Sequence, residues 1–246
     1  MTLEELKKKA ANGNQAAAMS LGDHYQEEKD YSTAYCYYEM AAQMGDNWTA
    51  TYNAMLAARN AGCDHLAQRS YREAATYFSN AIRGAKKLRD GKFSAQIDRK
   101  SRERVRETLS ECIYLHALVS YAQWQIQDVL DMLANARETK ARLLRGMALC
   151  QILQTMEAFD FLTCIEDRTF RPEYWEEQRF FSDAAINMAG FYRTGLTGKP
   201  EKGLKRSVAI LRSAMARVSD PQIKETLQKE LSKYRLRLFG GYAYVK

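Results

Sequence analysis

The sequence predicts an all-α protein built from antiparallel helix pairs, and three observations support this fold class. The chain of 246 residues has only 3 prolines and 13 glycines, too few for the many tight turns of a β-sandwich or β-barrel. Apolar residues recur with the period of a helix. No segment alternates strictly between apolar and polar residues, as a half-buried strand would. These patterns indicate about ten or eleven helices and no sheet.

Composition and the first residues indicate a soluble protein, which we expect in the cytoplasm. Hydrophobic residues make up 46% of the chain and charged residues 27%, so the chain can fill a core. No stretch approaches 18 uninterrupted apolar residues, so we expect no membrane-spanning helix. The charged start MTLEELKKKAANG lacks the apolar region of a secretory signal.

The five cysteines indicate reduced thiols rather than disulfides or a metal site. Their number is odd, their spacing is wide, and no CxxC pair occurs. Cys63 lies near His65, and Cys112 lies four residues before His116. Two candidate ligands make only a weak metal signal, so we interpret both pairs as structural. We expect no metal and no cofactor.

Motifs of known enzyme chemistry are absent from the sequence. It contains no glycine-rich phosphate loop, no nucleophile elbow and no HExxH. Carboxylates do gather on one helical stretch, at Glu173, Glu176, Glu177 and Asp183. Such a group is far more often a solvated helix face than an acid–base pair. We therefore expect no catalytic residues, with an unrecognised activity on a helical scaffold as the exception.

Residues 14–46 carry a regular spacing of small and aromatic residues. The pattern consists of Leu21, Gly22, Tyr25, Ala34, Tyr38 and Ala41. The small residues let two helices approach closely, and the tyrosines fill the gaps beside them. We expect Asp30 to cap the second helix and Gly45 to end it in a left-handed conformation.

This spacing resembles the tetratricopeptide repeat, L-G-x-x-Y followed by A-x-x-x-F and a further alanine. Ala18 stands in place of the usual tryptophan, and Asp46 in place of the closing proline. The stretch from Ala41 to Asp46 also resembles the related Sel-like repeats. The resemblance implies a right-handed α-solenoid in which antiparallel pairs stack into a superhelix.

A second, degenerate copy covers residues 50–85. Tyr71, Ala74, Phe78 and Ala81 each follow their counterparts in the first copy by 40 residues. Leu56-Ala57, in contrast, follows Leu21-Gly22 by only 35 residues. The difference predicts about five extra residues between the two helices, within Gly62–Arg69.

The repeats suggest a division of the chain near residue 91. We expect residues 1–91 to hold the repeats and a capping helix over 2–11, in which Thr2 and Glu5 form a capping box. Three prolines predict later helices over roughly 172–194, 200–218 and 221–238. Residues 92–246 would continue the same solenoid as divergent pairs, or alternatively form a separate helical bundle.

The resemblance also implies a function, because the first helix of each pair usually lines a concave binding face. We therefore expect a non-catalytic scaffold or adaptor that binds a peptide or partner protein. The candidate partner-binding residues are Met19, Asp23, Gln26, Thr51, Ala54 and Ala58. Some family members grip a terminal carboxylate with lysines and asparagines, which Met19 and Asp23 replace here. The alternative is that these positions pack against the protein's own helices.

Two basic segments, 83–106 and 199–237, support an alternative function, nucleic-acid binding. Residues 83–106 hold ten basic and three acidic residues. The candidate phosphate-binding residues are Arg99, Arg102, Arg106, Lys205, Arg206 and Arg212. Phosphate contacts become plausible if both segments lie on one face. The simpler interpretation is a solvated surface, and contact with acidic segments of a second copy would give self-association.

Overall fold

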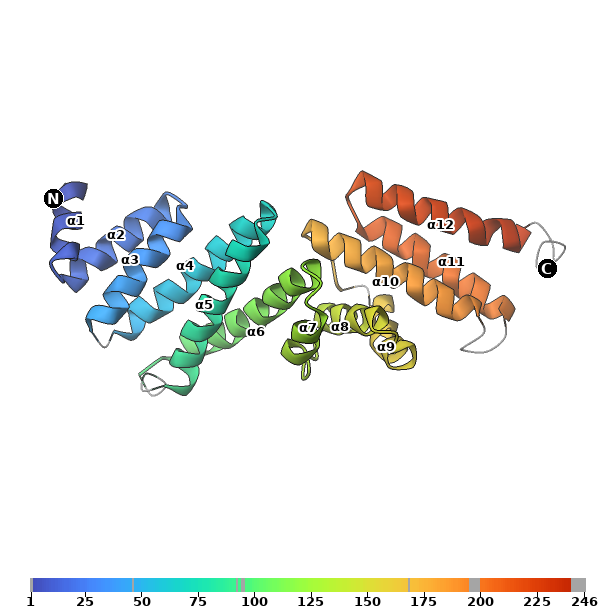
Figure 1. The fold of residues 1–246 in the computed structure, drawn as a ribbon, viewed down its shortest axis with the longest axis horizontal. Helices are drawn as coiled ribbons and strands as arrows, with labels where there is room; N and C mark the ends of the chain where they lie inside the picture. Colours follow the sequence, from blue (N-terminus) through green and yellow to red (C-terminus); the bar gives the residue numbers. More distant parts are fainter. Residues whose placement is uncertain are drawn as a thin grey trace. The chain divides into compact units, whose positions relative to one another are not determined.

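A computed structural model describes residues 2–45, 47–91, 93, 96–167, 169–194 and 200–239, without the side chains of 200, 201 and 235–239. Regular secondary structure in these ranges is entirely helical, which confirms the all-α prediction (Figure 1). The described residues form twelve α-helices, so the prediction of ten or eleven was wrong. One cause is a turn at Leu153, because the apolar residues from Leu143 to Phe159 follow the pattern of a single long helix.

The chain divides into two compact units, Met1–Gln123 (unit 1) and Trp124–Lys246 (unit 2). Unit 1 contains α1 (Leu3–Ala11), α2 (Gln15–Glu27), α3 (Tyr31–Met44), α4 (Trp48–Ala67), α5 (Tyr71–Asp90) and α6 (Arg99–Ala122). Unit 2 contains α7 (Ile126–Met132), α8 (Thr139–Gln151), α9 (Thr155–Leu162), the 3₁₀ helix η1 (Thr163–Glu166), α10 (Trp175–Arg193), α11 (Pro200–Arg217) and α12 (Pro221–Phe239). In unit 1 each helix packs mainly against the next one along the chain.

Two helix pairs of unit 1 are held by the same close contact. A methyl group at Gly22 of α2 would lie 2.5 Å from the Tyr38 ring of α3. A methyl group at Gly62 of α4 would lie 2.6 Å from the Phe78 ring of α5. In each pair the aromatic residue follows the glycine by 16 residues, and its side chain is buried. Only glycine leaves room for the ring at this distance.

The turns within these pairs also share one geometry. Lys29 and Arg69, each seven residues after the glycine, adopt left-handed backbone conformations with φ of 61° and 58°. The next amide closes the helix, from Asp30 N to Tyr25 O at 2.9 Å and from Ser70 N to His65 O at 2.8 Å. This is a Schellman motif, which satisfies the free carbonyl groups at the helix end.

The same arrangement recurs in unit 2, between α8 and α9. A methyl group at Gly146 would lie 2.8 Å from Leu162, again 16 residues later. Leu153 follows Gly146 by seven residues and has φ of 63°. Gln154 N donates to Leu149 O at 3.0 Å. The helix pair of the N-terminal repeats thus has a counterpart beyond residue 91, while a continuous solenoid stays a prediction.

The shared geometry overturns one alignment made from the sequence. Gly62, and not Ala57, is the counterpart of Gly22, so the two copies are offset by 40 residues throughout. The predicted insertion within Gly62–Arg69 is therefore wrong. The extra residues lie instead at the start of α4, which has 20 residues where α2 has 13.

Most of the predicted helix ends are confirmed. Thr2 and Glu5 form the capping box of α1, and the Asp30 carboxylate accepts a hydrogen bond from Thr33 N at 3.1 Å. Pro200 and Pro221 begin α11 and α12. Gly45, however, is extended, with φ of −173°, so the predicted left-handed end of α3 is wrong. Asp46 lies outside the described residues.

The start of α10 corrects two further predictions. This helix begins at Trp175 rather than near Pro172. Glu176 and Glu177 are buried, so they are not part of a solvated face. The Glu177 carboxylate accepts hydrogen bonds from the amides of Glu173 at 2.7 Å and Tyr174 at 3.3 Å. It therefore satisfies amide groups of the segment that leads into the helix.

The core that supports α6 lies between α4, α5 and α6. It consists of Met55, Ala85, Leu88, Phe93, Ile97, Val105 and Leu109, all buried. This cluster fixes the spacing of α4 and α6, whose outer faces carry the candidate site. In the part of the chain that the structure describes, the helices lack the length and hydropathy needed to cross a membrane.

Candidate functional site

A groove runs between α4 and α6 of unit 1. It consists of two cavities of about 480 Å³ and 320 Å³, which share Leu56, Arg104 and Glu107 as lining residues. The larger cavity is also lined by Tyr52, Lys100, Ser101 and Glu103, and the smaller by Gln26, Arg59, Asn60, Thr108 and Glu111. The lining side chains therefore come from α2, α4 and α6.

Helical spacing explains why these side chains share one groove. Tyr52, Leu56, Arg59 and Asn60 occupy positions i, i+4, i+7 and i+8 of α4, which form one helix face. On α6 the corresponding stripe runs from Lys100 through Arg104 and Glu107 to Glu111. At a rise of about 1.5 Å per residue, this stripe is roughly 16 Å long.

An ion pair between α4 and α6 lies in the smaller cavity. Arg59 binds the Glu111 carboxylate through Nε at 3.1 Å and Nη2 at 2.5 Å. Its Nη1 also donates to Asn60 Oδ1 at 3.0 Å. A two-pronged arginine–carboxylate contact fixes the orientation of both groups. This pair therefore holds the polar end of the groove in one arrangement.

The centre of the groove presents charges that the protein does not neutralise by direct contact. Arg104 and Glu107 line both cavities, yet neither forms a hydrogen bond or ion pair with any side chain that the structure describes. Tyr52 lies in the larger cavity with Arg104. Burial raises the pKa of the Tyr52 hydroxyl, and the positive charge of Arg104 opposes that rise.

The predicted partner-binding residues divide into two sets. Gln26 lines the smaller cavity. Met19 is half-buried against the apolar clusters of α1–α4, and Asp23 is exposed but accepts a hydrogen bond from the Tyr38 hydroxyl at 2.7 Å. Thr51, Ala54 and Ala58 are buried and offer no surface to a partner in this structure.

The alignment error explains the burial of the second set. Shifting the register of α4 by five residues turns the chosen face by about 140°, at about 100° per residue. With the 40-residue offset, the counterpart of Met19 is Arg59, which lines the groove. The signal was present in the sequence, since Gly22–Tyr38 and Gly62–Phe78 have the same spacing.

The α6 residues of the groove were missed for a different reason. Lys100, Arg104 and Glu107 belong to a segment in which no repeat motif is recognisable. Their alternating charges look like a solvated helix surface. Only the packing of α6 against α4 and α5 shows that one of its faces lines a cavity.

The predicted phosphate-binding residues lie in both units, and all six are exposed. Arg99, Arg102 and Arg106 lie on α6, outside the lining of the groove. Lys205, Arg206 and Arg212 lie on α11. Because the two sets belong to different units, a single face that contains both stays a prediction.

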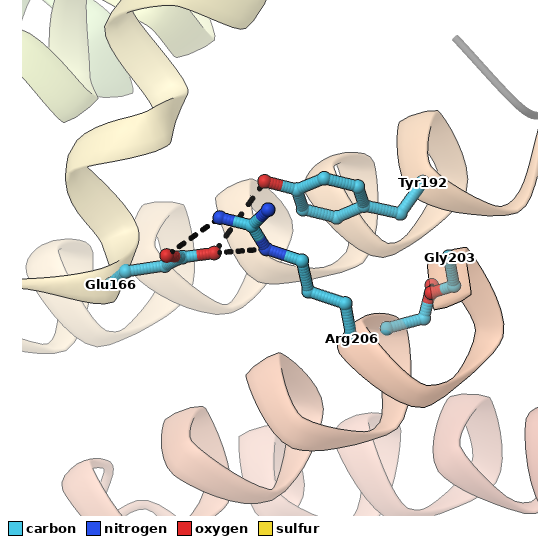
Figure 2. A network of polar contacts seen from close by, with 5 residues as sticks. Glu166, Tyr192, Gly203 and Arg206 are labelled. Atoms are coloured by element: carbon cyan, nitrogen blue, oxygen red, sulfur yellow. Dashed lines mark hydrogen bonds and ion pairs between the residues drawn. The ribbon is translucent and has the colours of Figure 1, made fainter. Parts of the chain in front are cut away.

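Arg206 is engaged within unit 2 rather than free for a ligand (Figure 2). Its Nε and Nη2 bind the Glu166 carboxylate at 2.7 and 2.9 Å, and its guanidinium lies 4.5 Å from the centre of the Tyr192 ring. The hydrogen bond from Arg206 holds the pKa of Glu166 below its usual value. This contact ties α11 to η1.

The close approach of α10 and α11 supports the same network. Figure 2 also shows Gly203 beside it, where an added methyl group would lie 2.1 Å from the Tyr192 carbonyl oxygen. The buried Ser207 hydroxyl donates to Ala189 O at 2.8 Å. Arg206 thus lies on a helix that packs tightly against α10, which favours a structural role for its ion pair with Glu166.

Among the described residues, no three histidine, cysteine or carboxylate side chains gather where they could hold a metal ion. Cys112 is buried, and burial raises the pKa of its thiol to about 12. A thiol with this pKa stays protonated at neutral pH and is a poor nucleophile or metal ligand.

Comparisons with known proteins do not assign the chain to a family. The chain matches no protein-family model, no curated protein and no solved structure.

Proposed function

We propose that this protein is a non-catalytic interaction scaffold of tetratricopeptide-like architecture, and that unit 1 binds a peptide segment of a partner protein between α4 and α6. One observation carries the proposal. The two adjoining cavities expose Arg104 and Glu107 without partners, beside the half-buried side chains of Tyr52 and Leu56. Apolar surface flanked by exposed charged groups is typical of recognition sites.

The dimensions of the groove suit a short peptide. A stripe of roughly 16 Å corresponds to about five residues of extended chain at about 3.3 Å each. The groove is lined by α2 and α4, the first helices of their pairs, together with α6. The repeat resemblance favours binding along such first helices. An extended peptide would place alternate side chains on Tyr52 and Leu56.

The charges of the groove define the kind of peptide. Three cations, Arg59, Lys100 and Arg104, face three anions, Glu103, Glu107 and Glu111. The lining therefore has no net charge, although the surrounding segment is strongly basic. We expect a partner segment with apolar residues and charges of both signs, and an affinity that depends only weakly on salt.

Site-specific crosslinking tests the proposal. A photoreactive amino acid at Leu56 should capture a partner that the same group at Glu73, which is exposed on α5, does not capture. The affinity of the purified partner segment is then measured by calorimetry. Arg104→Glu should weaken binding at least tenfold, which is about 1.4 kcal/mol.

Arg106→Glu provides the matched control, because it makes the same charge change two residues away, outside the groove. Equal losses in both variants would show that the groove is not the binding site. The proposal includes a cytoplasmic location, which fluorescence microscopy of the tagged full chain tests.

A further inference from the structure

We propose that a second surface of unit 1, formed by α5 and α6, binds the phosphate backbone of a nucleic acid. This surface, here called the basic surface, consists of Arg83, Lys86, Lys87, Arg99, Arg102 and Arg106, all exposed. It lies outside the peptide groove, so the inference goes beyond the proposed function. It would give the protein a second type of partner.

The hairpin of α5 and α6 carries these six residues in two rows, one on each helix. The two helices pack side by side and are joined by residues 91–98 (Figure 1). Residues at equal distances from this connection lie at the same level of an antiparallel pair. Arg83 lies seven residues before the end of α5, and Arg106 lies seven residues after the start of α6. Lys87 and Arg102 match in the same way, three residues from each end.

Within each helix the basic residues also share one face. Arg83, Lys86 and Lys87 stand at positions i, i+3 and i+4 of α5, and Arg99, Arg102 and Arg106 at i, i+3 and i+7 of α6. The groove residues of α6 form a different stripe, through Lys100 and Arg104. Around the helix axis of α6, the centres of the two stripes are more than a third of a turn apart. The helix therefore carries one face towards the peptide groove and another on the basic surface.

The surplus positive charge of the segment lies on the basic surface. The groove lining balances its own charges, and Arg89 pairs with Asp90 at 2.6 Å. Arg83 lies 3.7 Å from the Glu39 carboxylate and donates to the Tyr35 hydroxyl at 3.4 Å, and Arg102 also donates to Ile97 O at 3.0 Å. Like charges three or four residues apart on one helix repel one another, and a partner with regularly repeated negative charges removes that repulsion.

A nucleic acid supplies that repetition. From Arg99 to Arg106 the helix rises roughly 10 Å, over which duplex DNA presents about six phosphates at one charge per 1.7 Å. Four of the six residues are arginines, whose planar guanidinium binds a phosphate through two hydrogen bonds.

A lipid surface fits this region less well. Membrane-bound basic helices combine their cations with large exposed apolar residues that insert between the lipids. The large exposed apolar side chains of the described residues are Met40, Trp124, Ile152, Leu153 and Met156. None of these residues belongs to α5 or α6.

The test measures the salt dependence of binding by the full-length chain. Fluorescence anisotropy measures the binding of three labelled probes of about 20 nucleotides: single-stranded RNA, single-stranded DNA and duplex DNA. The salt concentration is varied from about 50 to about 300 mM. The affinity should fall linearly with salt on a log–log plot. Arg99→Gln/Arg106→Gln should reduce the slope by about 1.4 for single strands and about 1.8 for a duplex.

The matched control is Lys100→Gln/Arg104→Gln, which removes the same charge from the groove face of the same helix. It should leave the slope nearly unchanged and abolish binding of the partner peptide. Reduced nucleic-acid binding in this variant would contradict the basic surface, and retained peptide binding would contradict the peptide groove, so each proposal can fail on its own. Circular dichroism of both variants checks that the helices are retained.

Three outcomes would overturn the inference. The first is no binding of any of these probes at the lowest salt. The second is an equal change of slope in both double variants, which would reflect overall charge rather than a defined surface. The third is binding to vesicles of phosphatidylserine and phosphatidylcholine without binding to nucleic acids.

Discussion

Unit 1 and unit 2 stabilise their helix contacts in different ways. In unit 1, glycines allow aromatic rings to pack against the neighbouring helix, as at Gly22–Tyr38 and Gly62–Phe78. In the described part of unit 2, Gly146 makes a similar close contact with an aliphatic side chain, Leu162, and a polar network surrounds the segment that leaves η1. There, Arg217 of α11 donates to the carbonyl oxygens of Asp167 at 2.7 Å and Ile165 at 3.3 Å.

The difference affects how much of each unit's structure can be predicted from its sequence. A packing contact between neighbouring helices recurs at a fixed spacing, so it can be found by comparing copies. Arg217 and Asp167 are 50 residues apart, and the residues that the structure describes show no second copy of their contact to compare.

Phe78→Ala should have the largest effect. The ring is fully buried, so its removal leaves a cavity beside Gly62. We expect a loss of about 3–5 kcal/mol in the free energy of unfolding, measured by chemical denaturation. Hydrogen exchange should increase first in α4 and α5. A loss below about 1 kcal/mol would show that the ring contact does not hold this helix pair.

Arg217→Met should have the next largest effect. The variant keeps an apolar stem against Phe181, over which the guanidinium lies at 4.2 Å, and removes the hydrogen bonds to the two carbonyl groups. Hydrogen bonds to charged groups contribute about 1.5–3 kcal/mol, so a loss in this range is expected. Faster hydrogen exchange confined to residues 163–169 would support the network, whereas unchanged exchange there would contradict it.

Gly62→Ala should destabilise the chain by about 1–3 kcal/mol, because the new methyl group overlaps the Phe78 ring. Gly190→Ala is the matched control, since nothing lies within 4 Å of a methyl group at that helical position. The control should gain up to about 1 kcal/mol from helix propensity. Shifts of the two unfolding temperatures in opposite directions would confirm the packing argument, and shifts in the same direction would refute it.

Tyr38→Phe should have a small effect, because Phe78 fills the equivalent position without a hydroxyl group. The variant loses the hydrogen bond to Asp23, which is worth about 0.5–1.5 kcal/mol. Burial raises the pKa of Tyr38, so its hydroxyl stays protonated as a donor at neutral pH. Asp23→Asn retains an acceptor and serves as the comparison in denaturant titrations. A loss as large as that of Phe78→Ala would contradict this ranking.

The pH dependence of unit 2 should give the smallest change near neutral pH. A hydrogen bond from Thr139 is the largest cause that lowers the pKa of Asp167 to about 2, against about 3.9 in an unfolded chain. Its stabilising contribution is complete above about pH 4 and is lost as the pH falls towards 2. Asp167→Asn should flatten the stability curve in that window. An unchanged curve would show that the carboxylate is not the titrating group.

The sequence predicts the first helix pair well because each of its features depends on nearby residues. The cap at Asp30 and the small residues around Tyr38 are encoded within one 33-residue segment. The helix count failed at Leu153, because a leucine rarely adopts a left-handed turn and gives no breaking signal. The burial of Thr51, Ala54 and Ala58 was not predicted, because the alignment of α4 with α2 is fixed only by the Gly62–Phe78 contact.

The candidate site was predicted less well, because it requires three helices at once. Gln26 was found through the repeat pattern, whereas Arg104 and Glu107 belong to a segment without one. Charged residues on a helix have the same spacing whether they face solvent or a groove. Their role becomes visible only when α6 is placed beside α4.

The equal offset of the two turns at Lys29 and Arg69 has a consequence for protein engineering. A duplicate of residues 31–70, inserted after Ser70, would begin and end at the same point of the turn. The chain could then be lengthened by one helix pair without altering the backbone of either junction. The turn is thus a suitable junction at which further helix pairs could be added to this architecture.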